Sequence, residues 1–540
     1  RSDALIDLPA STRRNLELTQ TLRGESASDS PTLLALLATL ALTAAERPNI
    51  IVILADDQGL GDVSAYNPKG KIPTPHLDRL AAEGMRFTDG HTTSGVCTPS
   101  RYSLLTGRYH WRTRLQSGVL GGYSPPLIAK DRLTVAGFLK QQGYGTACFG
   151  KWHLGMSFAL KAGGVADDKG VFDGPGAKVG QAVNYAADIK DGPLDHGFDQ
   201  FYGISASLDM PPFVWIKDRR TTEIPSATKT WLRSGPAGPK FEAIDVQPGL
   251  IDQAMAYVTA QKQADPQKPF FIYLPLAAPH TPIVPTNEFK GSSGLNPYAD
   301  FVRQVDADVG RLMAKLEQLG LRENTLIVFT ADNGCSPAAR IEELQAKGHE
   351  PSYLYRGHKA DIFEGGHRVP FIVRWPAKVK PGSVNPQLIG QIDFLATFAE
   401  VLGVPVPAGA GEDSVSFLPA LLGREGPLRQ SIVSHSINGS FAIRDGQWKL
   451  ALCAGSGGWS APKPGSKEEK GLPEFQLYDL AIDLGEKTNL AAQHPERVVA
   501  MKAALQALVD RGRSTPGPAL ANDVPVVLVK KTGNKKQQDK

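Results

Sequence analysis

Short apolar runs that each end in a polar or ionisable group are the feature of this 540-residue sequence that most restricts its fold. They lie at 49–55, 144–149, 270–276 and 325–330, and they alternate with helix-like segments. This alternation is typical of an α/β fold around a largely parallel sheet. Because such sheets bind ligands outside the carboxyl ends of their strands, we expect the groups that follow the runs to converge on one site.

The groups that follow these runs suit catalysis beside a hard cation. In chain order they are Asp56 and Asp57, Lys151 and His153, His280, and Asp332 and Asn333. The carboxylates and the amide offer oxygen donors, which favour calcium or magnesium over zinc. The two histidines are the residue type most often used for proton transfer.

Composition excludes several classes of protein. Hydrophobic residues make up 41% and charged residues 21% of the chain, as in ordinary globular proteins. The net charge of +4 owes much to lysines near the C-terminus, so we expect no nucleic-acid partner. The four cysteines are far apart and form no CxxC pair, which argues against a thiolate zinc site or a disulfide scaffold: Cys97, Cys148, Cys335 and Cys453.

The sequence divides into four parts. Residues 1–46 form an N-terminal extension in which the apolar run 32–45 resembles a signal-peptide core, too short to span a membrane, and predicts a periplasmic or secreted protein. Residues 5–34 resemble a piece of the bacterial mismatch-repair ATPase family, which indicates a fusion or gene-model artefact. We expect the catalytic domain at 47–412, a smaller C-terminal subdomain at 413–513, and a flexible basic tail at 514–540.

The smaller subdomain has a different pattern from the catalytic domain. A Pro/Gly-rich connector at 404–411 precedes short strand-like pieces at 440–444, 448–452 and 475–478. A helical stretch at about 496–509 follows them. This order predicts a few antiparallel strands and one helix.

The segment Cys97-Thr98-Pro99-Ser100-Arg101 opens an apolar-periodic stretch and places a cysteine at a predicted helix N-terminus. Thr98 is the expected N-cap and Pro99 the expected first helical residue. Orphan backbone N–H groups and the helix dipole favour an anion there, either a thiolate or a bound sulfate.

Cys97-x-Pro-x-Arg101, continued to Thr106-Gly107, resembles the signature of the type I sulfatases. The stretch 143–153 resembles the second signature of that family, and the other groups named above occur in family order, so that the resemblance covers about 47–513. It implies an alkaline-phosphatase-like α/β fold, a large mixed, mostly parallel sheet flanked by helices. It also implies a maturation enzyme that oxidises Cys97 to formylglycine, whose hydrate attacks sulfur with one hydroxyl and expels sulfate through the other.

The resemblance also implies roles for individual residues. One calcium ion is held by Asp56, Asp57, the modified residue 97, Asp332 and Asn333. Arg101 and Lys151 hold the formylglycine hydroxyls, and Lys359 contacts the sulfate. His153 is the base that releases sulfate, and His280 is the general acid for the leaving alcohol.

Substrate and reaction class stay partly open. We predict an exo-acting carbohydrate sulfatase that also accepts aryl sulfates, with specificity from the loops 157–191, 205–239 and 335–356. Trp152, Trp215 and Tyr123 stack on a sugar or pack in the core, and His358 and His367 are candidates for substrate contact. The alternatives are a phosphonate or phosphate monoester hydrolase of the same fold, or a protein that binds sulfated glycans without turnover if Cys97 stays a thiol. The oligomeric state is open.

Overall fold

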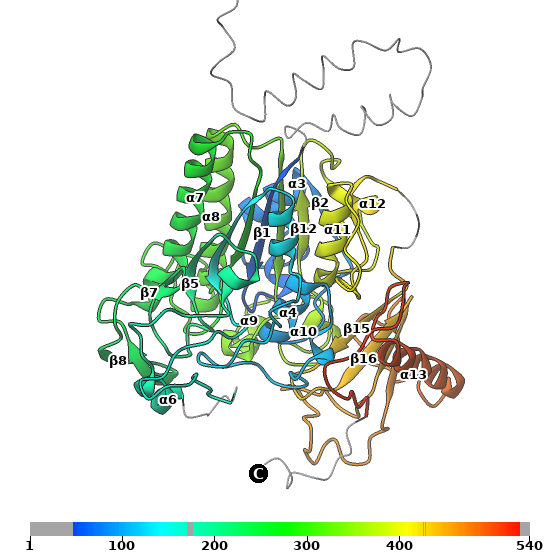
Figure 1. Cartoon of the computed structure of the whole chain (residues 1–540). Helices are drawn as coiled ribbons and strands as arrows, with labels where there is room; N and C mark the ends of the chain where they lie inside the picture. The colour runs from blue at the N-terminus through cyan, green and yellow to red at the C-terminus, as the bar shows by residue number, and fades with distance from the viewer. Residues whose placement is uncertain (1–46, 170–175, 425, 427, 530–540) are drawn as a thin grey trace, which may run out of the picture. The chain divides into compact units, whose positions relative to one another are not determined.

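The computed structural model describes residues 47–169, 176–424, 426 and 428–529 (Figure 1). The signal-peptide-like run and the rest of residues 1–46 lie outside the described residues, as do 530–540. Within the described part of the chain, no helix is both long and apolar enough to cross a membrane.

A ten-stranded sheet forms the framework, in the order β13-β2-β12-β11-β1-β10-β4-β5-β6-β7. Its centre is parallel, with β11, β1, β10, β4 and β5 side by side. The other strands add antiparallel pairings, with β13 again parallel to β2. The strand bounds are β1 Asn49–Ala55, β2 Met85–Phe87, β4 Gly145–Lys151, β5 Gln200–Ile204, β6 Ile216–Lys217, β7 Arg220–Thr221, β10 Phe270–Pro275, β11 Thr325–Ala331, β12 Phe371–Arg374 and β13 Ser383–Asn385.

Alternate side chains of β1 supply two hydrophobic cores, one on each face of the sheet, because successive residues of a strand point to opposite faces. Ile50, Val52 and Leu54 face a core with α4, α5, α11 and α12. Ile51, Ile53 and Ala55 face a core with α3, α7 and α8. The helix bounds are α3 Pro75–Ala82, α4 Cys97–Thr106, α5 Val135–Gln141, α7 Val246–Ala264, α8 Pro297–Gln318, α11 Phe394–Val401 and α12 Leu418–Leu421. The predicted mixed, mostly parallel sheet between helices is therefore confirmed.

A second, antiparallel sheet of four strands lies near the C-terminus, in the order β15-β16-β17-β18. It packs with α13 (Pro495–Asp510) around a separate hydrophobic core. This confirms the predicted small antiparallel sheet with a helix. The strands are β15 Ser431–His435, β16 Phe441–Asp445, β17 Trp448–Ala451 and β18 Gln476–Asp479.

Residues 514–529, predicted as part of the tail, contact the rest of the protein. Asp523 pairs with the buried Arg108 at 3.0 Å, and Leu528 belongs to the same hydrophobic core as α13. The remaining short elements are β3 Gly90–His91, β8 Ala227–Trp231, β9 Arg233–Ala237, β14 Ile389–Gly390, α6 Gly176–Ala182, α9 Ile341–Ala346 and α10 Glu364–His367.

Candidate active site at the carboxyl edge of the sheet

Strands β11, β1, β10 and β4 are consecutive and parallel in the sheet, so the four predicted strand ends meet at one edge. Asp56 N donates to the carbonyl of Ala278, two residues before His280, and Asp57 N donates to Asp332 Oδ1. The segments that follow β1, β10 and β11 are thus in direct contact. The predicted convergence is confirmed.

Cys97 is the first residue of α4, and its side chain is buried. The predicted cap is wrong: Val96 is the N-cap, and no side chain caps the helix. Thr98 lies inside the first turn, where its hydroxyl accepts a hydrogen bond from the Leu120 N–H instead. Burial raises the pKa of the Cys97 thiol, although Lys151 and Lys359 oppose this. The unmodified side chain is therefore a neutral thiol.

Three buried cations surround Cys97 and are paired with the carboxylates. Lys151 Nζ lies 2.7 Å from Asp56 Oδ2, Arg101 donates to Asp332 Oδ2 at 2.6 Å, and Lys359 Nζ lies 2.7 Å from Asp57 Oδ2. These six side chains come from five parts of the chain that are far apart in sequence, since only Asp56 and Asp57 are neighbours. They give the site alternating charges on buried side chains.

The cluster of carboxylates around Cys97 has the donor atoms of a cation site. Donor atoms of Asp56, Cys97 and Asp332 all lie within 4.8 Å of one another. Asp56 Oδ1 and Asn333 Oδ1 are buried and have no hydrogen-bond partner among the described residues. Burial and the nearby Asp56 charge raise the pKa of Asp332, despite Arg101 and Lys151. A hard cation would relieve this repulsion and use the orphaned oxygens.

The two predicted histidines are both present at this edge. Burial, with the charges of Lys151 and Arg101, holds the pKa of His153 well below its ordinary value, so its imidazole stays neutral. Its Nε2 lies 2.7 Å from the Leu120 carbonyl oxygen, which leaves Nδ1 without a hydrogen-bond partner among the described residues. His280 Nε2 lies 3.6 Å from Asp57 Oδ2, and its Nδ1 lies 2.7 Å from the Thr281 carbonyl oxygen.

Three residues of this site have a strained backbone conformation. Asp57, His153 and Ala360, the residue after Lys359, have φ values of 66°, 54° and 81°. Non-glycine residues occupy this left-handed region only when their surroundings impose it, at a cost of about 1–3 kcal/mol each. The fold thus holds these side chains in place at the expense of local stability.

Sequence reasoning missed a set of hydrogen-bonded groups that contact the backbone of Asp57. The Tyr298 hydroxyl donates to the Asp57 carbonyl at 3.1 Å and to Asp62 at 2.5 Å, and His349 Nε2 lies 2.8 Å from the other Asp62 oxygen. It also missed Gln58, whose buried amide has no partner for either polar atom among the described residues. Only the position of Gln58 directly after Asp57 could have signalled it.

Several candidate substrate contacts are instead packed into the core. Trp152 is fully buried and stacks on His196, and the fully buried Tyr123 shares a hydrogen bond with Tyr185. Trp215 stacks on Tyr202. His358 is partly exposed and lines a cleft of about 390 Å³.

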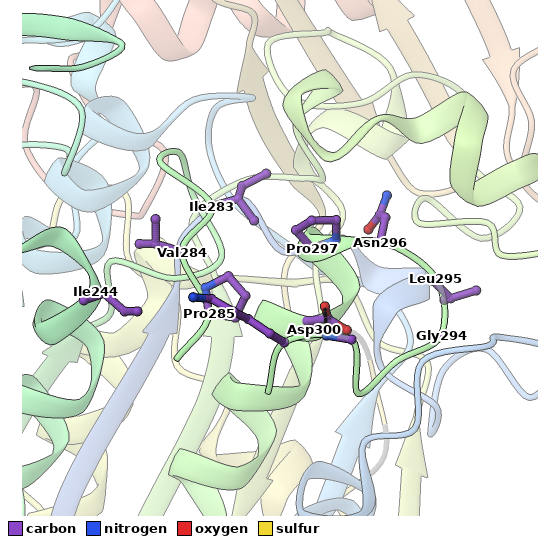
Figure 2. A pocket seen from close by; sticks show the side chains of 11 residues that line it. Ile244, Ile283, Val284, Pro285, Gly294, Leu295, Asn296, Pro297 and Asp300 are labelled. Carbon is purple, nitrogen blue, oxygen red and sulfur yellow. Dashed lines mark hydrogen bonds between the residues drawn. The ribbon is translucent and has the colours of Figure 1, made fainter. Parts of the chain in front are cut away.

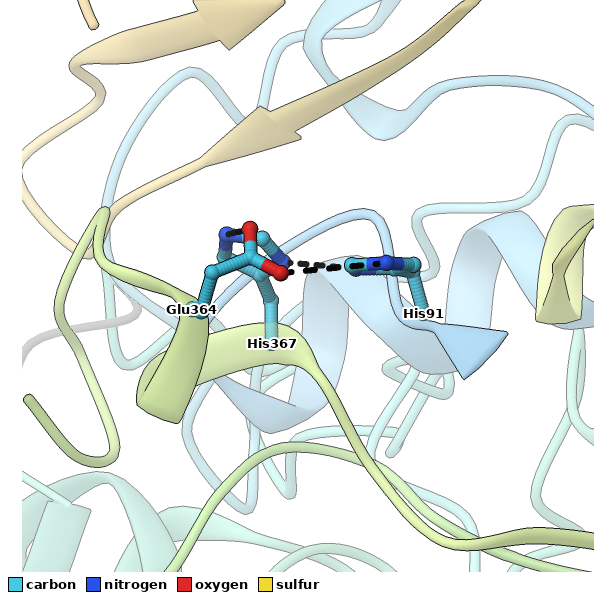
Figure 3. Close-up of side chains that lie close together, drawn as sticks. All are labelled: His91, Glu364 and His367. Carbon is cyan, nitrogen blue, oxygen red and sulfur yellow. Dashed lines mark hydrogen bonds and ion pairs between the residues drawn. The ribbon is translucent and has the colours of Figure 1, made fainter. Parts of the chain in front are cut away.

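His367 belongs to a separate buried cluster with His91 and Glu364 (Figure 3), whose donor atoms would also fit a metal. The ammonium of Lys449 already lies 3.0 Å from Glu364 Oε1 and 3.1 Å from His367 Nε2. Its charge takes the place that a metal would take. This cluster is a structural charge network.

An apolar pocket of about 470 Å³ lies on the segment after His280 (Figure 2). Ile283, Val284 and Pro285 line it together with the start of α8. None of the predicted site residues is among its lining residues. It is therefore separate from the charged site.

Comparison with known proteins places this chain in a family. Residues 48–404 match the sulfatase family model, and residues 358–452 match the model described as N-sulphoglucosamine sulphohydrolase, C-terminal. An N-acetylgalactosamine-6-O-sulfatase of Bacteroides thetaiotaomicron is 34% identical, over 86% of this chain and 94% of the relative. Human arylsulfatase A is 34% identical, over 87% of this chain and 89% of the relative.

A solved structure from a study of glycosaminoglycan metabolism by Bacteroides thetaiotaomicron also resembles this chain. It aligns with a TM-score of 0.72 at 33% identity, over 86% of this chain and 99% of that one. The protein belongs to the type I sulfatase family and is a sulfuric ester hydrolase.

Proposed function

We propose that the protein removes sulfate from a sulfated carbohydrate, with residue 97 in the formylglycine form and one calcium ion bound. The observation that carries this proposal is the position of Cys97, buried between three cations and a set of carboxylate donors. A neutral thiol with a raised pKa is a weak nucleophile there. Formylglycine would supply a hydrated aldehyde as the oxygen nucleophile, and a maturation enzyme must generate it.

Asp56, Asp57, Asp332 and Asn333 are the residues that would hold calcium. Their donor set is all oxygen, and two of its oxygens have no hydrogen-bond partner among the described residues. Calcium, when bound, would polarise the sulfate oxygens and favour the ionised form of a nearby hydroxyl. Residue 97 would add a further oxygen after conversion.

The cations would neutralise the sulfate ester and the charge that develops on it. Arg101 and Lys151 come from α4 and the end of β4, and both are fully buried. Lys359, from the loop before α10, is the cation expected to contact the sulfate itself. Preorganised charges in a site without water are worth far more than the same charges in solution.

The two histidines would carry the proton transfers. The neutral His153 donates its Nε2–H to the Leu120 carbonyl, so its Nδ1 carries a free lone pair, as a base that releases sulfate requires. His280 would protonate the departing alcohol, and its Nε2 lies 3.6 Å from Asp57 Oδ2.

A carbohydrate sulfate is the substrate class that the relatives favour, because one of them is named as an N-acetylgalactosamine-6-O-sulfatase. We further propose exo action, acceptance of small aryl sulfates, and a catalytic domain at 47–412 with a smaller subdomain at 413–513. The signal-peptide-like run supports export to the periplasm or the medium.

Release of free sulfate from sulfated mono- and oligosaccharides tests the function, and mass spectrometry of the tryptic peptide 87–101 tests the conversion of Cys97. We expect sulfate release from at least one sugar, loss of activity with a chelator, and an aldehyde at residue 97. An unmodified thiol in a fully active preparation would contradict the formylglycine mechanism. Faster hydrolysis of phosphonate monoesters than of any sulfate ester would favour the rival reaction.

A further inference from the structure

The stretch from Ser205 to Phe213 forms a wall of the catalytic site. It follows β5, which is the parallel neighbour of β4, and its Ser205 carbonyl accepts the His153 N–H at 2.9 Å. Ala206 and Met210 pack in the same buried cluster as Cys97. Side chains on this stretch therefore lie beside the nucleophile.

This wall contains a buried carboxylate with an unused oxygen. Asp209 is 3% exposed; one of its oxygens is paired with Arg233, while Oδ1 has no hydrogen-bond partner among the described residues. The hydroxyls of Ser205 and Ser207 are also buried without such a partner there. A buried acceptor left unpaired is costly, so polar atoms of this kind beside an active site indicate a ligand that donates to them.

Arg233 pairs with Asp209 from the β8–β9 hairpin, which contacts the wall. Phe213 N donates to the Pro236 carbonyl at 3.0 Å, which ties β9 to the wall. A Cβ on Gly235 would lie 2.4 Å from Pro211 Cβ, so the two backbones are in close contact. The Arg233 side chain is 23% exposed and reaches solvent at the edge of the site.

Trp459, from the C-terminal part of the chain, packs against the same cluster. It is partly exposed and, with Ile437, contacts the group that includes Cys97 and Met210. Its backbone N–H and that of Ser460 donate to Asp361 Oδ1 at 2.8 and 3.0 Å. The partly exposed indole ring offers an apolar face with a polar edge.

We propose that Asp209, Arg233 and Trp459 form the subsite for the sugar ring that carries the sulfate. Asp209 Oδ1 accepts hydrogen bonds from hydroxyl groups near the sulfated position, and Trp459 packs against the apolar face of the ring. This inference rests on the proposed function and deepens it: the substrate is a sulfated sugar with free hydroxyls beside the ester. A flat aryl sulfate offers Asp209 no donor.

The test compares kcat/KM for a sulfated monosaccharide that the wild type hydrolyses with kcat/KM for 4-nitrophenyl sulfate. We expect Asp209→Ala to lower the sugar-to-aryl ratio about 10- to 100-fold, the cost of losing a hydrogen bond to a charged group. Trp459→Leu and Arg233→Ala should lower the same ratio, which keeps the test decisive if Asp209→Ala does not fold. Asp195→Asn, which breaks a surface pair with Arg219, is the matched control and should leave the ratio unchanged.

Equal loss of both activities in all three variants would overturn the subsite while leaving the proposed function in place. Absence of sulfate release from both substrates by a wild type with converted residue 97 would instead overturn the proposed function, and the subsite with it. Retention of the wild-type ratio in Asp209→Ala would also refute the role of Asp209.

Discussion

Replacement of Lys449 by methionine should test how strongly the buried charge network around Glu364 stabilises the protein; Figure 3 shows Glu364 with His91 and His367. Lys449 is 1% exposed, and its ammonium lies 3.0 Å from Glu364 and 2.8 Å from Glu486, both fully buried. The network joins β17 to α10 and thus to the loop that carries Lys359. Methionine keeps most of the aliphatic length, so the change mainly removes charge.

Removing one partner of a buried ion pair costs about 3–5 kcal/mol, because the remaining charge is left without compensation. Lys449→Met leaves two such carboxylates, of which only Glu364 keeps another cation, Arg368, at 3.1 Å. We therefore expect the free energy of unfolding to fall by about 3–5 kcal/mol. Lys467→Met, at an exposed lysine in the same part of the chain, should cost less than about 0.5 kcal/mol.

The loss of stability caused by Lys449→Met should depend on pH. Burial, with the neighbouring Glu364 charge, raises the pKa of Glu486 to about 7 even with Lys449 present. A carboxyl whose folded pKa is raised reduces stability as the pH rises from its unfolded value to its folded one. Without Lys449 this pKa rises further, so the deficit of the variant should be larger at pH 8 than at pH 5.

Urea unfolding followed by tryptophan fluorescence measures these differences. The double variant Lys449→Met/Glu486→Gln should recover part of the loss, because a neutral amide replaces one unpaired charge. A Lys449→Met protein as stable as Lys467→Met, at both pH values, would refute the reasoning.

Four further predictions concern the catalytic site and one buried helix residue. His280→Ala should lower sulfate release from sugars about 10²- to 10⁴-fold but affect activated aryl sulfates far less; equal losses would contradict its role as the acid. Cys97→Ala should abolish turnover and keep sulfate-ester binding, measured by calorimetry; residual turnover would count against residue 97 as the nucleophile. A chelator should abolish activity, and added calcium at 100 times its Kd should restore it and stabilise the fold by about 2.7 kcal/mol, seen as a rise in Tm. Burial raises the pKa of Asp308 to about 6 from 3.8, so this carboxyl should lower stability by up to about 3 kcal/mol as the pH rises from 4 to 6. Asp308→Asn should flatten that part of the stability profile, and an unchanged profile would refute the assignment.

The central strands and the groups that follow them could be predicted from the sequence. The apolar run at 49–55 is β1 itself, and the runs at 144–149, 270–276 and 325–330 match β4, β10 and β11 within two residues at each end. Burial on both faces of a parallel sheet requires continuous apolar runs, and the polar residues after them must lie at one edge. Local pattern alone therefore determines which side chains can meet.

Contacts made by loops and by the C-terminal part depend on the tertiary structure. Nothing local predicts that Lys359 pairs with Asp57, that Trp459 packs beside Cys97, or that Trp152 stacks on His196 rather than on a substrate. The N-cap prediction also failed: Thr98 has a suitable side chain, but it lies inside the first turn and its hydroxyl accepts a hydrogen bond from the Leu120 N–H. Whether a polar or aromatic side chain faces a ligand or the core is set by what packs against its loop, and such partners lie from 22 positions away for Thr98 to 302 for Lys359.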